Sequence, residues 1–133
     1  MNTTKEYEVI FEPFTERHFI RTFAKKYKGA WDTTFGFLAA EFKFIDALFF
    51  KNTAEYITDK NADIVICKTE FKIAGTQESR HGSGNRCIVA IHKNLNKVCV
   101  LLVYYKNDLG GGSEMGNWTK LVKENYPQYS KIL

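Results

Sequence analysis

Two cationic side chains fall at the open end of a predicted β-hairpin. Between residues 84 and 108, two runs rich in β-branched residues flank the polar segment Asn94-Leu95-Asn96, a pattern typical of a hairpin with a turn of about three to five residues. Arg86 opens the first run and Lys106 closes the second, so the hairpin brings both to one end. We expect them to converge on an anion-sized hollow of the sheet, because such cations stabilise phosphates and other oxyanions.

The pleat of the hairpin predicts which side chains share a face. Pairing of Lys93 with Lys97 across the turn sets the register. In that register Arg86 faces Tyr104, and Lys106 lies on the same side, because side chains two residues apart point the same way. A one-residue slip would change the partners but leave both cations at the open end. Tyr104 is then either a catalytic partner of Arg86 or a ring that stacks under its guanidinium.

Cleavage of RNA without a metal needs a base for the 2′-hydroxyl, cations for the pentavalent phosphate and an acid for the 5′-oxygen. The candidate cations on the predicted strands and the loop between them are Lys68, Lys72, Arg80, Arg86 and Lys106. His81 is the candidate acid or base, because it lies in the loop at 77–84 and an imidazole exchanges a proton near neutral pH. Plainer interpretations stay open: Lys68 and Lys72 flank Glu70 as cross-strand charge pairs, and His81 is an exposed loop residue.

The other two histidines are not candidates for the same phosphate. In the register above His92 faces Val98, and it lies three residue pairs from Arg86, roughly 20 Å along the strand at about 3.3 Å per residue. We therefore expect His92 to be a surface or turn-facing group. His18 falls on the first predicted helix, where we expect a structural or solvated role.

The chain as a whole has the composition of one packed domain. Its 133 residues are 44% hydrophobic and 15% aromatic, which excludes a disordered chain and allows a substantial core. The net charge of +4 gives a weak preference for anionic partners. We find neither a run of about 18 apolar residues nor a basic-then-apolar leader, so we expect no membrane span, no secretory signal and a cytoplasmic location.

Three cysteines, Cys67, Cys87 and Cys99, fall in predicted strands. An odd number of this kind fits reduced, buried thiols in a cytoplasmic protein. A zinc site built from them and a histidine is disfavoured, because no Cys-x-x-Cys pair exists. We expect no metal and no cofactor.

The N-terminal half predicts one strand and two helices. A strand over 7–11 is followed by a helix over 15–28 that Thr15 would cap and Gly29 would end. A second helix over 31–49 carries apolar residues at intervals of four and three, the spacing of a helix face that packs on another element. Gly36 lies inside this helix, where we expect close packing.

The C-terminal half predicts a run of strands and a last helix. A polar connection over 51–63, with a helical turn near residues 54–56, leads to a strand or bent pair of strands over 64–74. A flexible loop over 77–84 precedes the hairpin, and Ser113 caps a helix that runs to Pro127. This order predicts an α+β domain with helices on one face of a mainly antiparallel sheet of about four strands: two N-terminal helices and a C-terminal helix.

The element order, the Gly84-Asn85-Arg86 start of the hairpin, the Val100–Lys106 strand and the C-terminal helix resemble the RelE/ParE toxin superfamily of bacterial toxin-antitoxin modules. The resemblance spans residues 5–126 in element order and 71–108 in local sequence. It implies one RelE-like domain over 1–133.

In that family, ribosome-dependent members cut messenger RNA with basic residues on a concave sheet face and without a metal. The resemblance implies that Lys72, Arg86 and Lys106 match the family's strand and hairpin cations, and that Arg80 matches a loop arginine. RNA-cutting members often carry a tyrosine shortly after the last strand. The interval 108–112 has no aromatic residue, so Tyr104 or Tyr105 would have to take that place.

The leading hypothesis is therefore a toxin that cleaves ribosome-bound mRNA, inhibits translation and is restrained by a cognate antitoxin. The catalytic candidates are Arg86, Lys106, Tyr104 and His81; the RNA-binding candidates are Lys68, Lys72 and Arg80. Two alternatives remain: a non-enzymatic toxin that inhibits a partner protein such as DNA gyrase, and a repurposed module that only binds a protein. Asp108 and Glu114 beside the glycine triplet favour a mobile last helix that an antitoxin could displace or clamp.

Overall fold

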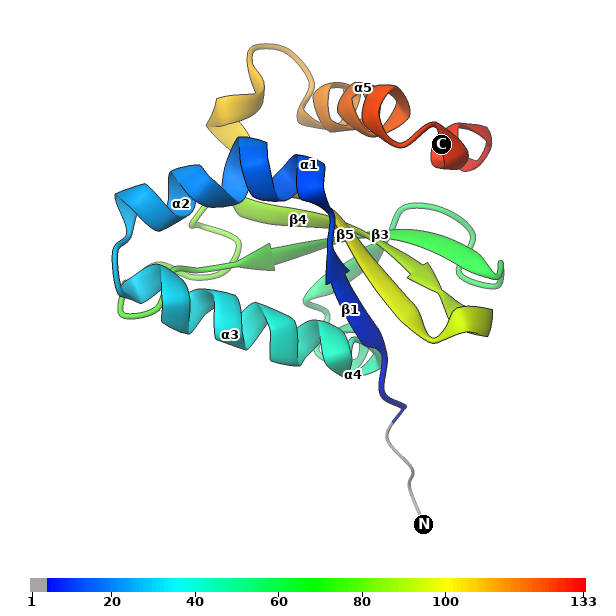
Figure 1. The fold of residues 1–133 in the computed structure, drawn as a ribbon, viewed down its shortest axis with the longest axis horizontal. Coiled ribbons are helices and arrows are strands. Elements are labelled where there is room, and N and C mark those ends of the chain that lie inside the picture. The colour runs from blue at the N-terminus through cyan, green and yellow to red at the C-terminus, as the bar shows by residue number, and fades with distance from the viewer. Residues whose placement is uncertain (1–4) are drawn as a thin grey trace.

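The computed structural model describes residues 5–133, which form one mixed sheet with helices on both faces (Figure 1). The sheet has five strands in the order β1-β5-β4-β3-β2. The strands are β1 (Glu8–Phe11), β2 (Ala54–Tyr56), β3 (Ile64–Phe71), β4 (Asn85–His92) and β5 (Lys97–Tyr105). β1 runs parallel to β5, and the other three pairings are antiparallel. The α+β class and the mainly antiparallel sheet are confirmed.

The sheet has one strand more than the sequence predicts, because β2 forms where we expected a polar connection with a helical turn. Its three residues pair with Cys67–Thr69 of β3, and the Tyr56 ring stacks on Phe49 at 4.1 Å between centroids. Three residues are too few to show a strand's period of two. The strand is therefore stabilised by its neighbours and not by its own pattern.

The first helical segment begins earlier than predicted and consists of α1 (Pro13–Thr15), a π-helical turn η1 (Glu16–Ile20) and α2 (Arg21–Lys26). Thr15 is wrong as the helix cap. It lies inside the segment, fully buried, and its hydroxyl accepts a hydrogen bond from the Val103 backbone N–H at 2.9 Å. Pro13 begins the helix instead, in the first turn where its missing N–H costs nothing.

The predicted second helix is broken into α3 (Ala30–Lys43) and α4 (Asp46–Phe50). The break has a tertiary cause: the carbonyl of Lys43 accepts a hydrogen bond from the Tyr7 N–H at 2.9 Å, next to β1. Gly29, at φ 75°, separates α2 from α3 as predicted. The close packing expected at Gly36 is wrong, because a Cβ there would meet no atom within 4 Å.

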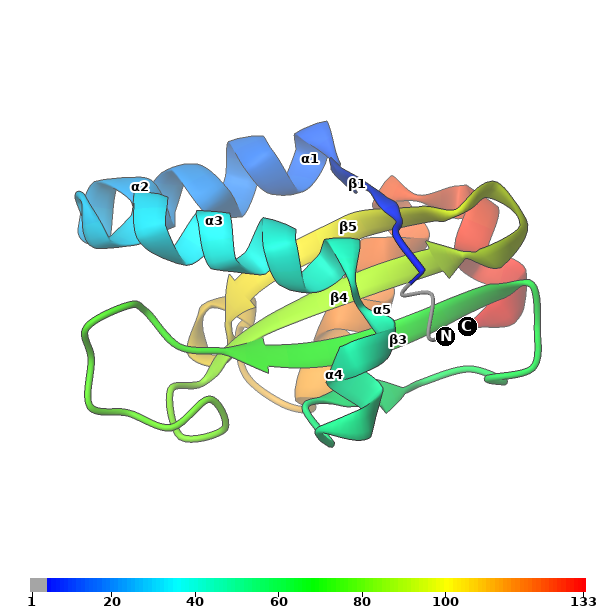
Figure 2. The ribbon, with the colours of Figure 1, turned by 90° about the horizontal axis from the view of Figure 1, so that it is seen from below.

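The C-terminal helix α5 (Glu114–Asn125) covers the face of the sheet opposite to α2 and α3 (Figure 2). Helices therefore lie on both faces, where the sequence led us to expect one. Ser113 caps α5 as predicted, since its hydroxyl accepts from the Gly116 N–H at 3.1 Å. The 3₁₀ segment η4 (Pro127–Ile132) follows on the same face. Trp118, Val122, Tyr126 and Tyr129 fill the core on this side.

The central hairpin keeps the predicted register only at its open end. Arg86 pairs with Tyr104 as expected, but Val89 pairs with Val100, so a bulge leaves Leu101 unpaired. The freed carbonyl of Leu101 accepts a hydrogen bond from the Tyr126 hydroxyl at 2.9 Å. The turn itself is the 3₁₀ segment η2 (Lys93–Leu95), and a second such segment, η3 (Lys106–Leu109), ends β5.

The three cysteines are unbridged and buried, as expected. Burial raises the pKa of the Cys67 thiol to about 12. No helix within residues 5–133 combines the length and the apolar character needed to cross a membrane.

Candidate functional site

The guanidinium of Arg86 lies in a polar cluster between β3, β4 and the start of α5. Its side chain is 4% exposed, and its Nη1 lies 3.0 Å from Oε2 of Glu70. Its Nε lies 3.9 Å from Oε2 of Glu114, a charge contact rather than a hydrogen bond. Two backbone carbonyls complete the shell, those of Asn85 and His81, each 3.2 Å from a guanidinium nitrogen. A buried arginine requires this kind of compensation.

Strand pairing and helix capping place the two carboxylates. Glu70 is the direct cross-strand partner of Arg86 in the β3–β4 ladder, so both side chains emerge on one face. Glu114 is the first residue of α5 after the Ser113 cap, a position where the helix dipole favours a negative charge. The side chains of Glu70 and Glu114 are 27% and 30% exposed, so the cluster opens to solvent on its carboxylate side.

Tyr104 joins the cluster from β5 as the cross-strand partner of Arg86. Its hydroxyl donates a hydrogen bond to Oε2 of Glu114 at 2.8 Å. Burial, and then the Glu114 carboxylate, raise the pKa of Tyr104 well above its ordinary value. The phenol therefore keeps its proton at neutral pH and acts as a hydrogen-bond donor.

His81 reaches the same carboxylate from the loop between β3 and β4. Its Nδ1 lies 2.7 Å from Oε2 of Glu70, the oxygen that also contacts Arg86. The imidazole is 86% exposed. The loop is anchored on both sides of it: Arg80 pairs with Glu41 of α3 at 2.8 Å, and the Ser83 hydroxyl bonds to the carbonyl of Phe71.

The structure therefore joins Arg86, Tyr104 and His81 in one bonded cluster. The other sequence candidates lie around or away from it. Lys68 shares the face of Glu70 but pairs with Glu55 at 3.8 Å. Lys72 and Arg80 line a cavity of about 580 Å³ beside α3. Lys106 is exposed, and its side chain forms no ion pair with residues 5–133.

Two expectations about this region need correction. The hollow that Arg86 was expected to offer to an anion is filled by the chain's own carboxylates, Glu70 and Glu114. His92 is not simply turn-facing: it pairs with Lys97 rather than Val98, and its Nε2 lies 2.8 Å from the Tyr129 hydroxyl. The bulge at Leu101 shifts this end of the ladder by one residue.

Glu70 is the residue that sequence reasoning missed as a participant. It stands between Lys68 and Lys72, so it was interpreted only as their charge partner. The signal that could have found it is strand alternation, which places Glu70 on the same face as Lys68. Its position opposite Arg86 depends on how the loop at 77–84 closes the β3–β4 pair, which no local pattern shows.

The cluster contains the groups that acid–base catalysis on a phosphodiester uses. A carboxylate can accept a proton, an imidazole can donate one, and a guanidinium stabilises negative charge that develops between them. Within the described part of the chain, no three His, Cys, Asp or Glu side chains are grouped to hold a metal ion.

Compared with family models, curated proteins and solved structures, the chain matches none of them.

Proposed function

We propose that this protein is a toxin of a toxin-antitoxin pair that cleaves mRNA without a metal, with Glu70 as general base and His81 as general acid. One observation carries the proposal: a single oxygen of Glu70 lies 2.7 Å from the imidazole of His81 and 3.0 Å from the guanidinium of Arg86. Base, acid and cation thus lie together at one end of the central sheet. The α+β class is the one that the sequence predicts.

The reaction is an internal transfer at phosphorus. Glu70 accepts the proton of the 2′-hydroxyl, and the 2′-oxygen forms a bond to phosphorus. The bond from phosphorus to the 5′-oxygen breaks, and His81 gives its proton to that oxygen. The products are a 2′,3′-cyclic phosphate and a 5′-hydroxyl, and Arg86 stabilises the extra negative charge of the pentavalent state.

The phosphate enters where carboxylates now surround Arg86. His81 is largely exposed, so it can swing away from Glu70. Glu114 lies 3.9 Å from the guanidinium, so it makes the weaker of the two carboxylate contacts with Arg86. The incoming phosphate therefore takes the place of the Glu114 carboxylate beside Arg86.

The remaining candidates have binding roles in the proposal. Tyr104 donates a hydrogen bond and is not the base, because its pKa is raised. Lys68 and Lys106 attract the RNA backbone, as do Lys72 and Arg80. Ribosome-bound mRNA is the substrate and an antitoxin is the restraining partner.

The test is cleavage of RNA by purified protein in excess EDTA, with and without translating ribosomes. Mass spectrometry of the fragments should show 2′,3′-cyclic phosphate ends. Glu70→Gln and His81→Gln should each lower the cleavage rate about 10²- to 10⁴-fold, the usual contribution of a positioned acid or base.

Glu124→Gln is the matched control, because Glu124 is an exposed α5 carboxylate whose only ion pair among residues 5–133 is with Lys120. It should cleave like the parent, and thermal unfolding should show that all variants fold. Unchanged cleavage in both Glu70→Gln and His81→Gln would refute the assigned roles. Growth arrest with intact message and accumulating DNA breaks would instead support inhibition of a partner such as DNA gyrase.

A further inference from the structure

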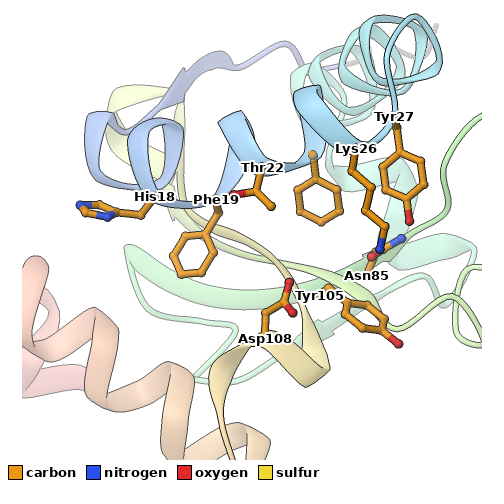
Figure 3. Close-up of a pocket in the computed structure, with 9 residues that line it drawn as sticks. His18, Phe19, Thr22, Lys26, Tyr27, Asn85, Tyr105 and Asp108 are labelled. Atoms are coloured by element: carbon orange, nitrogen blue, oxygen red, sulfur yellow. The ribbon is translucent and has the colours of Figure 1, made fainter.

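A second polar site lies at the open end of the central hairpin, where Asn85 precedes Arg86 on β4. It is a cavity of about 360 Å³ between the first helical segment and the open end of the β4–β5 hairpin (Figure 3). This volume lies at the small end of the range for ligand sites, which suits a ligand of one or two rings. Of the sequence candidates for RNA cleavage, only Tyr105, the alternative to Tyr104, lines it.

Aromatic rings form the sides of this cavity. Figure 3 shows Phe19 projecting from η1, Tyr27 from the end of α2 and Tyr105 from the end of β5 into the same space. The Tyr105 hydroxyl is held by Asn107, whose side-chain amide donates to it at 3.0 Å. Flat, oriented rings of this kind are the surfaces on which single-stranded bases stack.

Asn85 supplies an amide group to the wall of the cavity. The residue is only 3% exposed, and its backbone N–H bonds to the Ser83 hydroxyl. The amide lines the cavity, where it offers one acceptor and two donors to a ligand edge.

A cation and a carboxylate stand at the rim of the cavity, and both are unpaired within residues 5–133. The Lys26 ammonium lies 5.3 Å from the ring centre of Tyr27 and 5.8 Å from that of Tyr105. Asp108 points its carboxylate into the space between Phe19 and Tyr105 (Figure 3). A carboxylate accepts from the N–H groups of a base, whereas an ammonium binds a phosphate.

We propose that this cavity binds one ribonucleotide base. Tyr105 and Phe19 stack on its ring, Asn85 and Asp108 hydrogen-bond to its edge, and Lys26 pairs with its phosphate. That the base belongs to RNA rests on the proposed function. Asn85 and Arg86 are consecutive residues on opposite faces of β4, so a strand that crosses the end of the sheet places one nucleotide here and the neighbouring phosphate at Glu70.

The test is binding, which does not depend on cleavage. Isothermal titration and amide chemical-shift changes are measured with the four ribonucleoside 5′-monophosphates, with ribose 5-phosphate and with a tetraribonucleotide that carries 2′-O-methyl groups and so resists cleavage. Nucleotides should bind with shifts at residues 19–27 and 105–108, and ribose 5-phosphate should bind at least tenfold more weakly. If the oligonucleotide binds more tightly than the mononucleotides, the site is one for RNA. If the two bind equally, the site is one for a free nucleotide, and either result supports a base-binding site.

Lys26→Ala and Tyr105→Leu should each weaken nucleotide binding about tenfold. Lys25 is the exposed neighbour of Lys26 and does not line the cavity, so the affinity of Lys25→Ala should stay within about twofold of the parent. Asn85→Leu replaces the amide by an apolar group of similar size and should also weaken binding, once thermal unfolding shows that it folds. Absence of binding to every nucleotide, equal binding of ribose 5-phosphate, or equal effects of Lys25→Ala and Lys26→Ala would overturn the proposal. If the parent protein binds nucleotides but does not cleave RNA, the proposed function is refuted and the base-binding site stands.

Discussion

Arg86 and Glu70 are direct cross-strand partners whose side chains form an ion pair, with Nη1 and Oε2 3.0 Å apart and the guanidinium side chain only 4% exposed. Within the described residues the sheet has two further cross-strand ion pairs, Lys97 with Glu8 at 3.7 Å and Lys68 with Glu55 at 3.8 Å. The Lys68 pair serves for comparison, because Glu55 is 65% exposed. The Arg86–Glu70 and Lys68–Glu55 pairs both join direct partners on antiparallel strands, but the first pair is more buried than the second. Their energetic contributions should therefore differ.

Arg86→Met should destabilise the fold by about 2–4 kcal/mol, because it leaves Glu70 and Glu114 without their cation. Urea unfolding measures the change. Lys68→Met, which breaks the more exposed pair, should cost less than about 1 kcal/mol. Equal losses in the two variants would show that burial of Arg86 does not control its contribution.

Thr15→Val should cost about 1–3 kcal/mol, because it leaves the buried Val103 N–H without its acceptor. Thr69→Val is the matched control. The Thr69 hydroxyl is buried with no hydrogen-bond partner among the described residues apart from the Cys87 sulfur, a weak acceptor, so its removal should be neutral or stabilising. Denaturant titration measures the free energy of unfolding of both variants. A large loss of stability in Thr69→Val with no loss in Thr15→Val would contradict the hydrogen bonding described here.

Gly36→Ala should stabilise the protein by up to about 1 kcal/mol, because alanine is the better helix former and a Cβ at this position meets open space. Gly84→Ala should destabilise it. Gly84 has φ 77°, and its Cβ would lie 2.8 Å from Cε1 of Tyr105. The melting temperatures should move in opposite directions, and a fall for Gly36→Ala would mean that the helix surface there is covered.

His92 should make stability depend on pH. Burial lowers its pKa; Lys97 acts in the same sense, whereas Asp63 and Glu12 oppose it. The unfolded chain then binds a proton more readily than the folded one, so the free energy of unfolding should fall as pH drops through about 6.5.

The measurement for His92 is urea unfolding at pH 7.5 and pH 5.5. His92→Gln should reduce the loss of stability between the two values, whereas His18→Gln, at an exposed position, should not. If both variants keep the full pH dependence of the parent, the proton is taken up elsewhere.

Several features follow from residue types and local spacing alone. The Ser113 cap and the helix end at Gly29 are short-range effects, since each depends on neighbours within one turn. The predicted facing of Arg86 and Tyr104 holds because the bulge at Leu101 offsets the one-residue difference at the turn. The α+β class follows from the order of such segments. A resemblance in the hairpin supplied the hypothesis of RNA cleavage.

Tertiary structure decided what local patterns cannot contain. The bulge at Leu101, the helix break after Lys43 and the strand β2 all depend on hydrogen bonds to distant parts of the chain. The same holds for the site: α5 packs on the opposite face and brings Glu114 to Arg86, and the β3–β4 register brings Glu70. A uniformly apolar or charged run is compatible with several registers, and only burial against the rest of the molecule selects one.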